Sequence, residues 1–68
     1  MAAGVLKVFN LDRGFGFIKP DDGSDDVFVH VSAADRAGIV LHQGMRLGFD
    51  LEKDRKTGKP RAGNLTLL

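Results

Sequence analysis

Two neighbouring segments of this chain are apolar on both of their alternating faces, which limits what the chain can fold into. The segments are "FGFIKP" (15–20) and "VFVHV" (27–31), and the acidic run "DDGSDD" (21–26) separates them. The chain has 68 residues and no cysteine. A protein of this size buries only about 60% of its extended surface. It can hardly bury both faces of both segments, so one face is expected to stay in contact with solvent.

The two faces differ in what they would bury. Side chains alternate along a strand, so one face of 27–31 carries valines only and the other carries Phe28 and His30. Phe15 and Phe17 share a face in the same way. Burying an unpartnered His30 would cost about 1–3 kcal/mol, whereas branched valines suit the interior of a narrow barrel. We therefore expect the Phe/His face to be exposed. The residues alone leave the opposite orientation open, because phenylalanine in a strand is usually part of the core.

Turn residues divide the chain into five strand-like runs, which cover 4–10, 15–20, 27–31, 45–52 and 61–68. Gly, Asp and Pro between these runs provide the turn conformations. A short all-β chain best avoids exposed edges by closing into a barrel. Glycines within the strands, at 16, 48 and 63, suit bends or bulges. The pattern predicts an all-β fold, a small sandwich or barrel of five strands, that forms a single domain over residues 1–68.

Only the segment "SAADRAG" (32–38) has a helical pattern. Ser32 is an acceptable N-cap, and Asp35 stands at the third helical position, as in a capping box. Gly38 can end the helix. The segment predicts one or two helical turns.

Charge is balanced overall but unevenly distributed. Ten basic and nine acidic residues give a net charge of +1. Four aspartates lie in 21–26, and five basic residues lie in 53–61. The simpler interpretation of each run is a solvated hairpin turn. No segment has the composition of a signal peptide or the ~18 apolar residues of a membrane span. We expect a cytoplasmic protein without a membrane partner.

Enzymatic patterns do not fit this sequence. The spacing of "DDGSDD" (21–26) differs from that of a calcium loop. His30 and His42 lack the further ligands that a zinc site requires. Ser32 follows His30 by two residues, but no acidic partner or oxyanion donor accompanies them. We expect no catalysis, no metal, no cofactor and no small-molecule substrate.

Exposed rings beside cations indicate a binding surface. A contiguous apolar patch on a surface usually marks a binding site. Flat rings near His30 and the basic residues Lys7, Arg13 and Lys19 could stack unpaired nucleobases while the cations contact phosphates. The residues therefore favour binding to single-stranded nucleic acid.

At these residues the sequence resembles the cold-shock domain family. "RGFGFI" (13–18) matches the first ribonucleoprotein-type motif of that family, and "VFVHV" (27–31) matches the second in all but its last position. The similarity extends to "GVLKVFN" (4–10) and "AGNLTLL" (62–68), so it covers essentially the whole chain. The two motifs at this spacing are specific, whereas either one alone would be weak.

The resemblance implies an antiparallel barrel of the oligonucleotide/oligosaccharide-binding type (OB-fold). It implies a monomer that binds single-stranded RNA or DNA across its first three strands, as an RNA chaperone or a regulator of gene expression. The nucleic-acid-binding residues that it implies are Lys7, Phe9, Arg13, Phe15, Phe17, Phe28 and His30. The core positions that it implies include Val5, Ile18, Val27, Val29 and Leu47.

Three positions depart from the aromatic pattern of the family: Val8, Val31 and Ile39 are aliphatic. Base–aromatic stacking contributes about 1–3 kcal/mol per base, so we expect weaker binding than is typical of the family. The same departures leave an alternative open. The barrel could instead be a protein–protein interaction module with little affinity for nucleic acid.

Overall fold

The chain forms five strands and one short helix in the computed structural model, which describes residues 2–68. Met1, which the predicted domain includes, lies outside the described residues. The elements are β1 (Ala2–Asn10), β2 (Phe15–Pro20), β3 (Val27–His30), α1 (Val31–Ala37), β4 (Arg46–Lys53) and β5 (Pro60–Leu67). Strand boundaries lie within two residues of those predicted from the turn signals.

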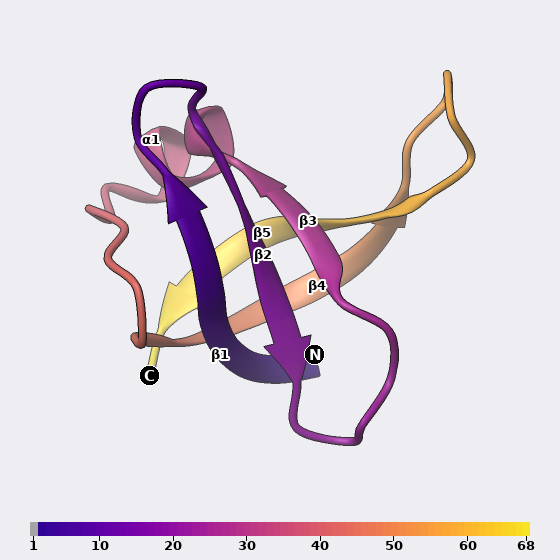
Figure 1. Cartoon of the computed structure of the whole chain (residues 1–68), viewed down its shortest axis with the longest axis horizontal. Coiled ribbons are helices and arrows are strands. Elements are labelled where there is room, and N and C mark those ends of the chain that lie inside the picture. Colours follow the sequence, from indigo (N-terminus) through magenta and orange to yellow (C-terminus); the bar gives the residue numbers. More distant parts are fainter. Residues whose placement is uncertain (1) are drawn as a thin grey trace.

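The strands close into a barrel in the order β1-β2-β3-β5-β4, which confirms the predicted fold. Four of the strand pairings are antiparallel. The barrel closes between β3 and β5 through a single parallel pair, Phe28 opposite Arg61. Figure 1 shows β1, β2 and β3 side by side at the front, with β4 and β5 crossing behind them and α1 at the upper end.

Branched and aromatic side chains from all five strands fill the interior. Ile18, Val27, Val29 and Leu47 are buried there, as predicted. The interior also contains Phe49, whose side chain is completely buried. One phenylalanine therefore supports the core, while three others lie on the opposite face of β2 and β3. The valine face is inside the barrel, as predicted from the composition of the two faces.

The prediction that Val5 belongs to the core is wrong. It is only partly buried and lies opposite Lys19 on the outer face of the barrel. The core position belongs to Leu6, which has no exposed surface and lies opposite Ile18.

A bulge at Lys7 shifts the alternation along β1. Leu6 pairs with Ile18, but Val8 already pairs with Phe17, so Lys7 has no partner in the ladder. An extra residue of this kind bends the strand and changes which side chains face inward. After the bulge, Val8 lies on the outer face and Phe9 on the inner one. Gly16 faces Phe9 and must be glycine, because a Cβ there would collide with the carbonyl oxygen of Val8.

A second register shift lies between β4 and β5, where two of the strand glycines were expected to allow bends or bulges. Gly48 pairs with Thr66, and Asp50 pairs with Gly63, so the ladder slips between these pairs. The expectation is confirmed for Gly48 and Gly63.

The helix begins two residues earlier than predicted, and its N-cap is His30 rather than Ser32. His30 has extended backbone angles at the end of β3, and its Nδ1 accepts the backbone N–H of Ser32 at 3.1 Å. The capping box at Asp35 does not form, because the helix starts at Val31. Gly38 ends the helix in the left-handed conformation, as predicted. Along residues 2–68 there is no helix long and apolar enough to cross a membrane.

Candidate nucleic-acid interface

Three phenylalanine rings form a contiguous cluster on the outer side of β2 and β3. The register places Phe17 opposite Phe28, and Phe15 opposite His30. The Phe15 and Phe28 rings are stacked, with centroids 5.8 Å apart. The Phe17 ring meets both edge-on, at 5.9 Å from each. We call the surface formed by Phe15, Phe17, Phe28, His30 and Val8 the aromatic face.

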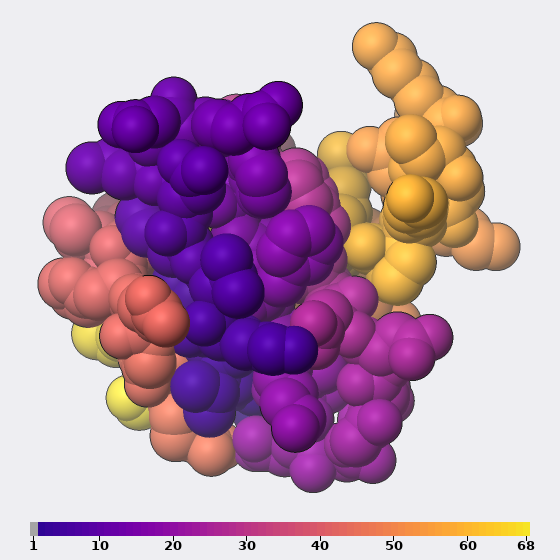
Figure 2. Space-filling model, viewed as in Figure 1, coloured from indigo at the N-terminus to yellow at the C-terminus, as the bar shows by residue number. Residues whose placement is uncertain are grey.

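The rings of the aromatic face are half-buried, and each lies within 6 Å of the other two. The neighbouring residues on the same strands, Ile18, Val27 and Val29, point inward and are buried. Figure 2 shows the side of the molecule on which β1, β2 and β3 lie, coloured indigo to magenta, with the orange β4–β5 hairpin projecting beside them. The prediction that the rings face outward is therefore confirmed.

His30 stands at the upper edge of the aromatic face, where β3 ends and α1 begins. Its Nδ1 lies 2.9 Å from the Ser32 hydroxyl, in addition to accepting the Ser32 amide. These two contacts hold the imidazole plane in place. Because Nδ1 accepts the amide hydrogen, Nε2 carries the proton of the neutral ring. The exposed ring is thus held in one orientation next to Phe15.

Two predicted cations flank the rings. The Arg13 guanidinium lies 5.7 Å from the centre of the Phe15 ring, within the range of a cation–π interaction. Lys7, at the bulge of β1, forms an exposed ion pair with Asp26 at 3.2 Å. Exposed pairs contribute only about 0.2–1 kcal/mol, so a phosphate can compete with Asp26 for Lys7.

Phe9 does not lie with the other predicted site residues. The bulge turns it to the inner side of β1, where it faces Gly16 and packs against the core. It is only partly exposed. The structure therefore brings together Phe15, Phe17, Phe28 and His30 and places Phe9 behind them.

The three positions at which this chain has an aliphatic residue in place of an aromatic one lie in different surroundings. Val8 is on the aromatic face opposite Phe17, and 46% of it is exposed. Val31 begins α1, and its amide donates to the Gly14 carbonyl at 2.8 Å. Ile39 packs against the core, so it presents little surface to a ligand. Among the three, Val8 is the position at which a ring would directly extend the aromatic face.

The two charged loops are ordered turns, as predicted. In the β2–β3 loop, Asp21 forms an ion pair with Arg46 at 2.6 Å. Hydrogen bonds to the neighbouring Asp22, first from the side chain of Ser24 and second from its backbone, lower the pKa of Asp22. In the β4–β5 hairpin, the Asp54 carboxylate accepts the amides of Thr57 and Lys56, which lowers the pKa of Asp54.

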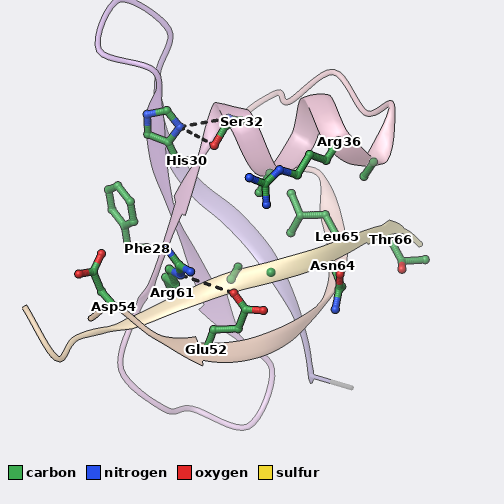
Figure 3. A pocket seen from close by; sticks show the side chains of 14 residues that line it. Phe28, His30, Ser32, Arg36, Glu52, Asp54, Arg61, Asn64, Leu65 and Thr66 are labelled. Carbon is green, nitrogen blue, oxygen red and sulfur yellow. Dashed lines mark hydrogen bonds and ion pairs between the residues drawn. The ribbon is translucent and has the colours of Figure 1, made fainter. Parts of the chain in front are cut away.

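A groove of about 600 Å³ adjoins the aromatic face, and sequence reasoning did not find it. Phe28 and His30 form its rim, α1 forms one wall, and β4 and β5 form the other. Figure 3 shows Arg36 reaching from α1 into this space above Leu65. No local signal marks such a groove, because its two walls come from segments that are far apart in the sequence.

Comparisons with known proteins agree with this geometry. Residues 2–68 match the sequence profile of a family described as 'Cold-shock' DNA-binding domain. The chain is 58% identical over 66 residues to a probable cold shock protein of Sinorhizobium fredii, with 96% of each chain covered. It is 52% identical over 66 residues to a cold shock protein of Rhizobium meliloti, again with 96% of each covered. A cold shock protein of Arthrobacter globiformis is 42% identical over 69 residues, with both chains fully covered.

Proposed function

We propose that this chain, which belongs to the cold-shock domain family, binds single-stranded RNA or DNA by stacking bases on its aromatic face. The observation that carries the proposal is the contiguous cluster of Phe15, Phe17 and Phe28 outside the barrel, with their rings within 6 Å of one another. A small protein that keeps three aromatic rings outside its core has a surface suited to a flat, apolar partner. Unpaired nucleobases are such partners.

The flanking cations support the same proposal. Arg13 lies against the Phe15 ring, and Lys7 lies beside Val8 on β1. Bases stacked on the rings would leave their phosphates toward the edges of the aromatic face, within reach of such side chains. Duplex RNA hides its base faces, so binding of this kind favours open segments. An RNA chaperone activity follows without any nucleotide hydrolysis, because preferential binding to the open form shifts the equilibrium.

We further propose that the affinity is lower than is typical of the family. Val8 occupies an exposed position on the aromatic face, where an aromatic ring would add a stacking partner. Each stacked base contributes about 1–3 kcal/mol, and a tenfold change in affinity corresponds to about 1.4 kcal/mol. The absence of even one ring therefore weakens binding by roughly one order of magnitude, and exchange with free ligand becomes fast.

A titration of the ¹⁵N-labelled protein with a short oligothymidine or oligouridine tests the proposal. We expect amide shifts that move continuously and cluster in residues 7–31, with the largest changes next to Phe15 and Phe28. Residues 55–59, at the tip of the β4–β5 hairpin and outside the lining of the groove, supply internal reference signals. Shifts spread evenly over the barrel, or no shifts at millimolar ligand, would refute base stacking at this surface.

The second candidate is an interaction module in which the aromatic face contacts a protein or a second copy of this chain. The exposed aliphatic side chain of Val8, which stands in place of an aromatic ring, favours contact with a protein over base stacking. The same titration discriminates between the two. No response to oligonucleotide, together with line broadening that grows with protein concentration, would favour self-association. Resonances that stay sharp as the protein is concentrated fit the proposed monomer.

A further inference from the structure

The groove beside the aromatic face exists because β3 stops early. β3 and β5 pair only at Phe28 and Arg61. Beyond that pair the chain leaves the sheet at His30 and forms α1, so the next residues of β5 have no neighbouring strand on that side. The helix packs against part of β5, and a groove remains between them. Its volume, about 600 Å³, is within the range of about 300–1,000 Å³ that is common for ligand sites.

The groove and the aromatic face share their boundary. Phe28 and His30 belong to both: their rings lie on the outer side of β3 and also line the groove. His30 is fixed there by Ser32, which lines the groove as well (Figure 3). A nucleic-acid strand with a base stacked on Phe28 or His30 would therefore lie beside the groove.

The charged side chains that line the groove, Arg36, Glu52, Asp54 and Arg61, are not equivalent. The Asp54 carboxylate accepts the backbone amides of Lys56 and Thr57. Arg61 is paired with Glu52 at 3.5 Å across the β4–β5 ladder. The Glu52 carboxylate lies close over Gly63, where an added Cβ would approach its Cδ to 2.5 Å. Glu52 is thus held against the wall and partly neutralised by Arg61. Arg36, on the opposite wall, forms no ion pair with any residue in 2–68, so its guanidinium is available to an anion.

We propose that this groove binds the nucleotide next to those stacked on the aromatic face, and that Arg36 binds a phosphate of that nucleotide. The inference rests on the proposed function and adds a second part to the same site. A free guanidinium is suited to phosphate recognition, because its N–H groups match the phosphate oxygens. The groove is open at the rim formed by Phe28 and His30, which is where the strand would enter.

The test compares two oligothymidine lengths, about four and about eight nucleotides, within the range of about 4–16 nucleotides bound by one such barrel. Affinities are measured by anisotropy of labelled oligonucleotides at several salt concentrations, for the unchanged protein and for Arg36→Ala. Arg46→Ala is the control for overall charge, because it removes the same charge and lines neither surface; it differs from Arg36→Ala in also breaking the exposed ion pair with Asp21. Arg36→Lys retains the charge, and melting temperatures of all variants report on folding.

For the longer oligonucleotide we expect Arg36→Ala to lower the affinity about two- to fivefold, as for an exposed charge pair. The slope of log affinity against log salt should fall by about 0.7, the value for one phosphate contact to a single strand. The shorter oligonucleotide should fit on the aromatic face and be unaffected. Arg36→Lys should restore most of the slope, and Arg46→Ala should change neither length.

Three results would overturn the inference. The first is an unchanged slope for the longer oligonucleotide in Arg36→Ala. The second is an equal loss at both lengths, which would mean that Arg36 acts through the overall charge or the stability of α1. The third is the same loss in Arg46→Ala. If neither oligonucleotide binds the unchanged protein, the proposed function fails, and this inference fails with it.

Discussion

Phe49 and Phe28 have the same side chain but lie in two regions of the molecule in which that side chain has different roles. Phe49, from β4, is completely buried among the residues of the barrel interior, including Leu6 and Ile18. Phe28, from β3, is half-buried, and the rings that contact it are those of Phe15 and Phe17 on the outer face. Burial of the first ring contributes to folding. The second ring leaves surface uncovered, and we propose that a ligand covers that surface.

The largest expected effect is on the interior. Removing a buried phenylalanine costs about 3–5 kcal/mol, and a core of this size supplies only about 3–5 kcal/mol of net stability. Phe49→Ala should therefore leave the chain largely unfolded at 25 °C, as measured by circular dichroism and by the dispersion of amide signals. Phe28→Ala should remain folded, with a loss of about 1 kcal/mol for a half-buried ring. Equal losses in the two variants would remove the distinction between the two regions.

The next prediction adds a ring to the outer region. Val8→Trp places an aromatic side chain opposite Phe17, at a position that is already 46% exposed. One further stacked base is expected to contribute about 1–3 kcal/mol, so affinity for oligothymidine should rise roughly 5- to 150-fold. The chain contains no tryptophan, so the new indole also reports binding through its own fluorescence.

Leu67→Trp is the control for this gain. Leu67 is 62% exposed near the end of β5, opposite Leu47, and lies outside the aromatic face. Its replacement adds the same ring to the surface without extending the cluster. A similar gain in affinity from both variants would show that any exposed ring suffices, and that the arrangement on β2 and β3 is not what binds.

The smallest effect concerns the β4–β5 hairpin, which belongs to neither region. Hydrogen bonds from the amides of Thr57 and Lys56 hold the pKa of Asp54 below its ordinary value of 3.8. The folded state therefore gains stability from this carboxylate above that value, and loses it as the pH falls through the lower, folded-state pKa. In an acid titration followed by NMR, the Lys56 and Thr57 amides should shift with a midpoint below pH 3.8. A midpoint at or above that value would contradict the hydrogen-bonded turn.

Much of the fold follows from local patterns. The acidic run at 21–26 and the basic run at 53–61 are hairpin turns, as their Gly and Asp content indicates. Strict alternation correctly assigned the inward faces of β2 and β3. Alternation does not extend along β1, because the bulge at Lys7 depends on the register with β2 and has no signature in the sequence of β1 itself. This one residue accounts for the inward position of Phe9.

The candidate site was predictable only where regular strands carry it. Phe15, Phe17, Phe28 and His30 lie on regular segments, so their common face can be read from alternation. His30 as a helix cap was missed, because imidazole is an uncommon cap and Ser32 is a better one by composition. Arg36 was missed because its importance depends on the distance between α1 and β5, which only the closed barrel determines.

The most direct test of the central claim uses Phe15→Leu/Phe28→Leu, which removes two rings and retains apolar side chains. Its affinity for oligothymidine and its free energy of unfolding are measured together. Loss of stacking on the two rings should reduce affinity by at least about tenfold. The free energy of unfolding should change by less than about 1 kcal/mol, because leucine fills most of the half-buried volume. Unchanged affinity with a large loss of stability would contradict the account, because it would mean that the rings outside the barrel hold the fold together and bind nothing.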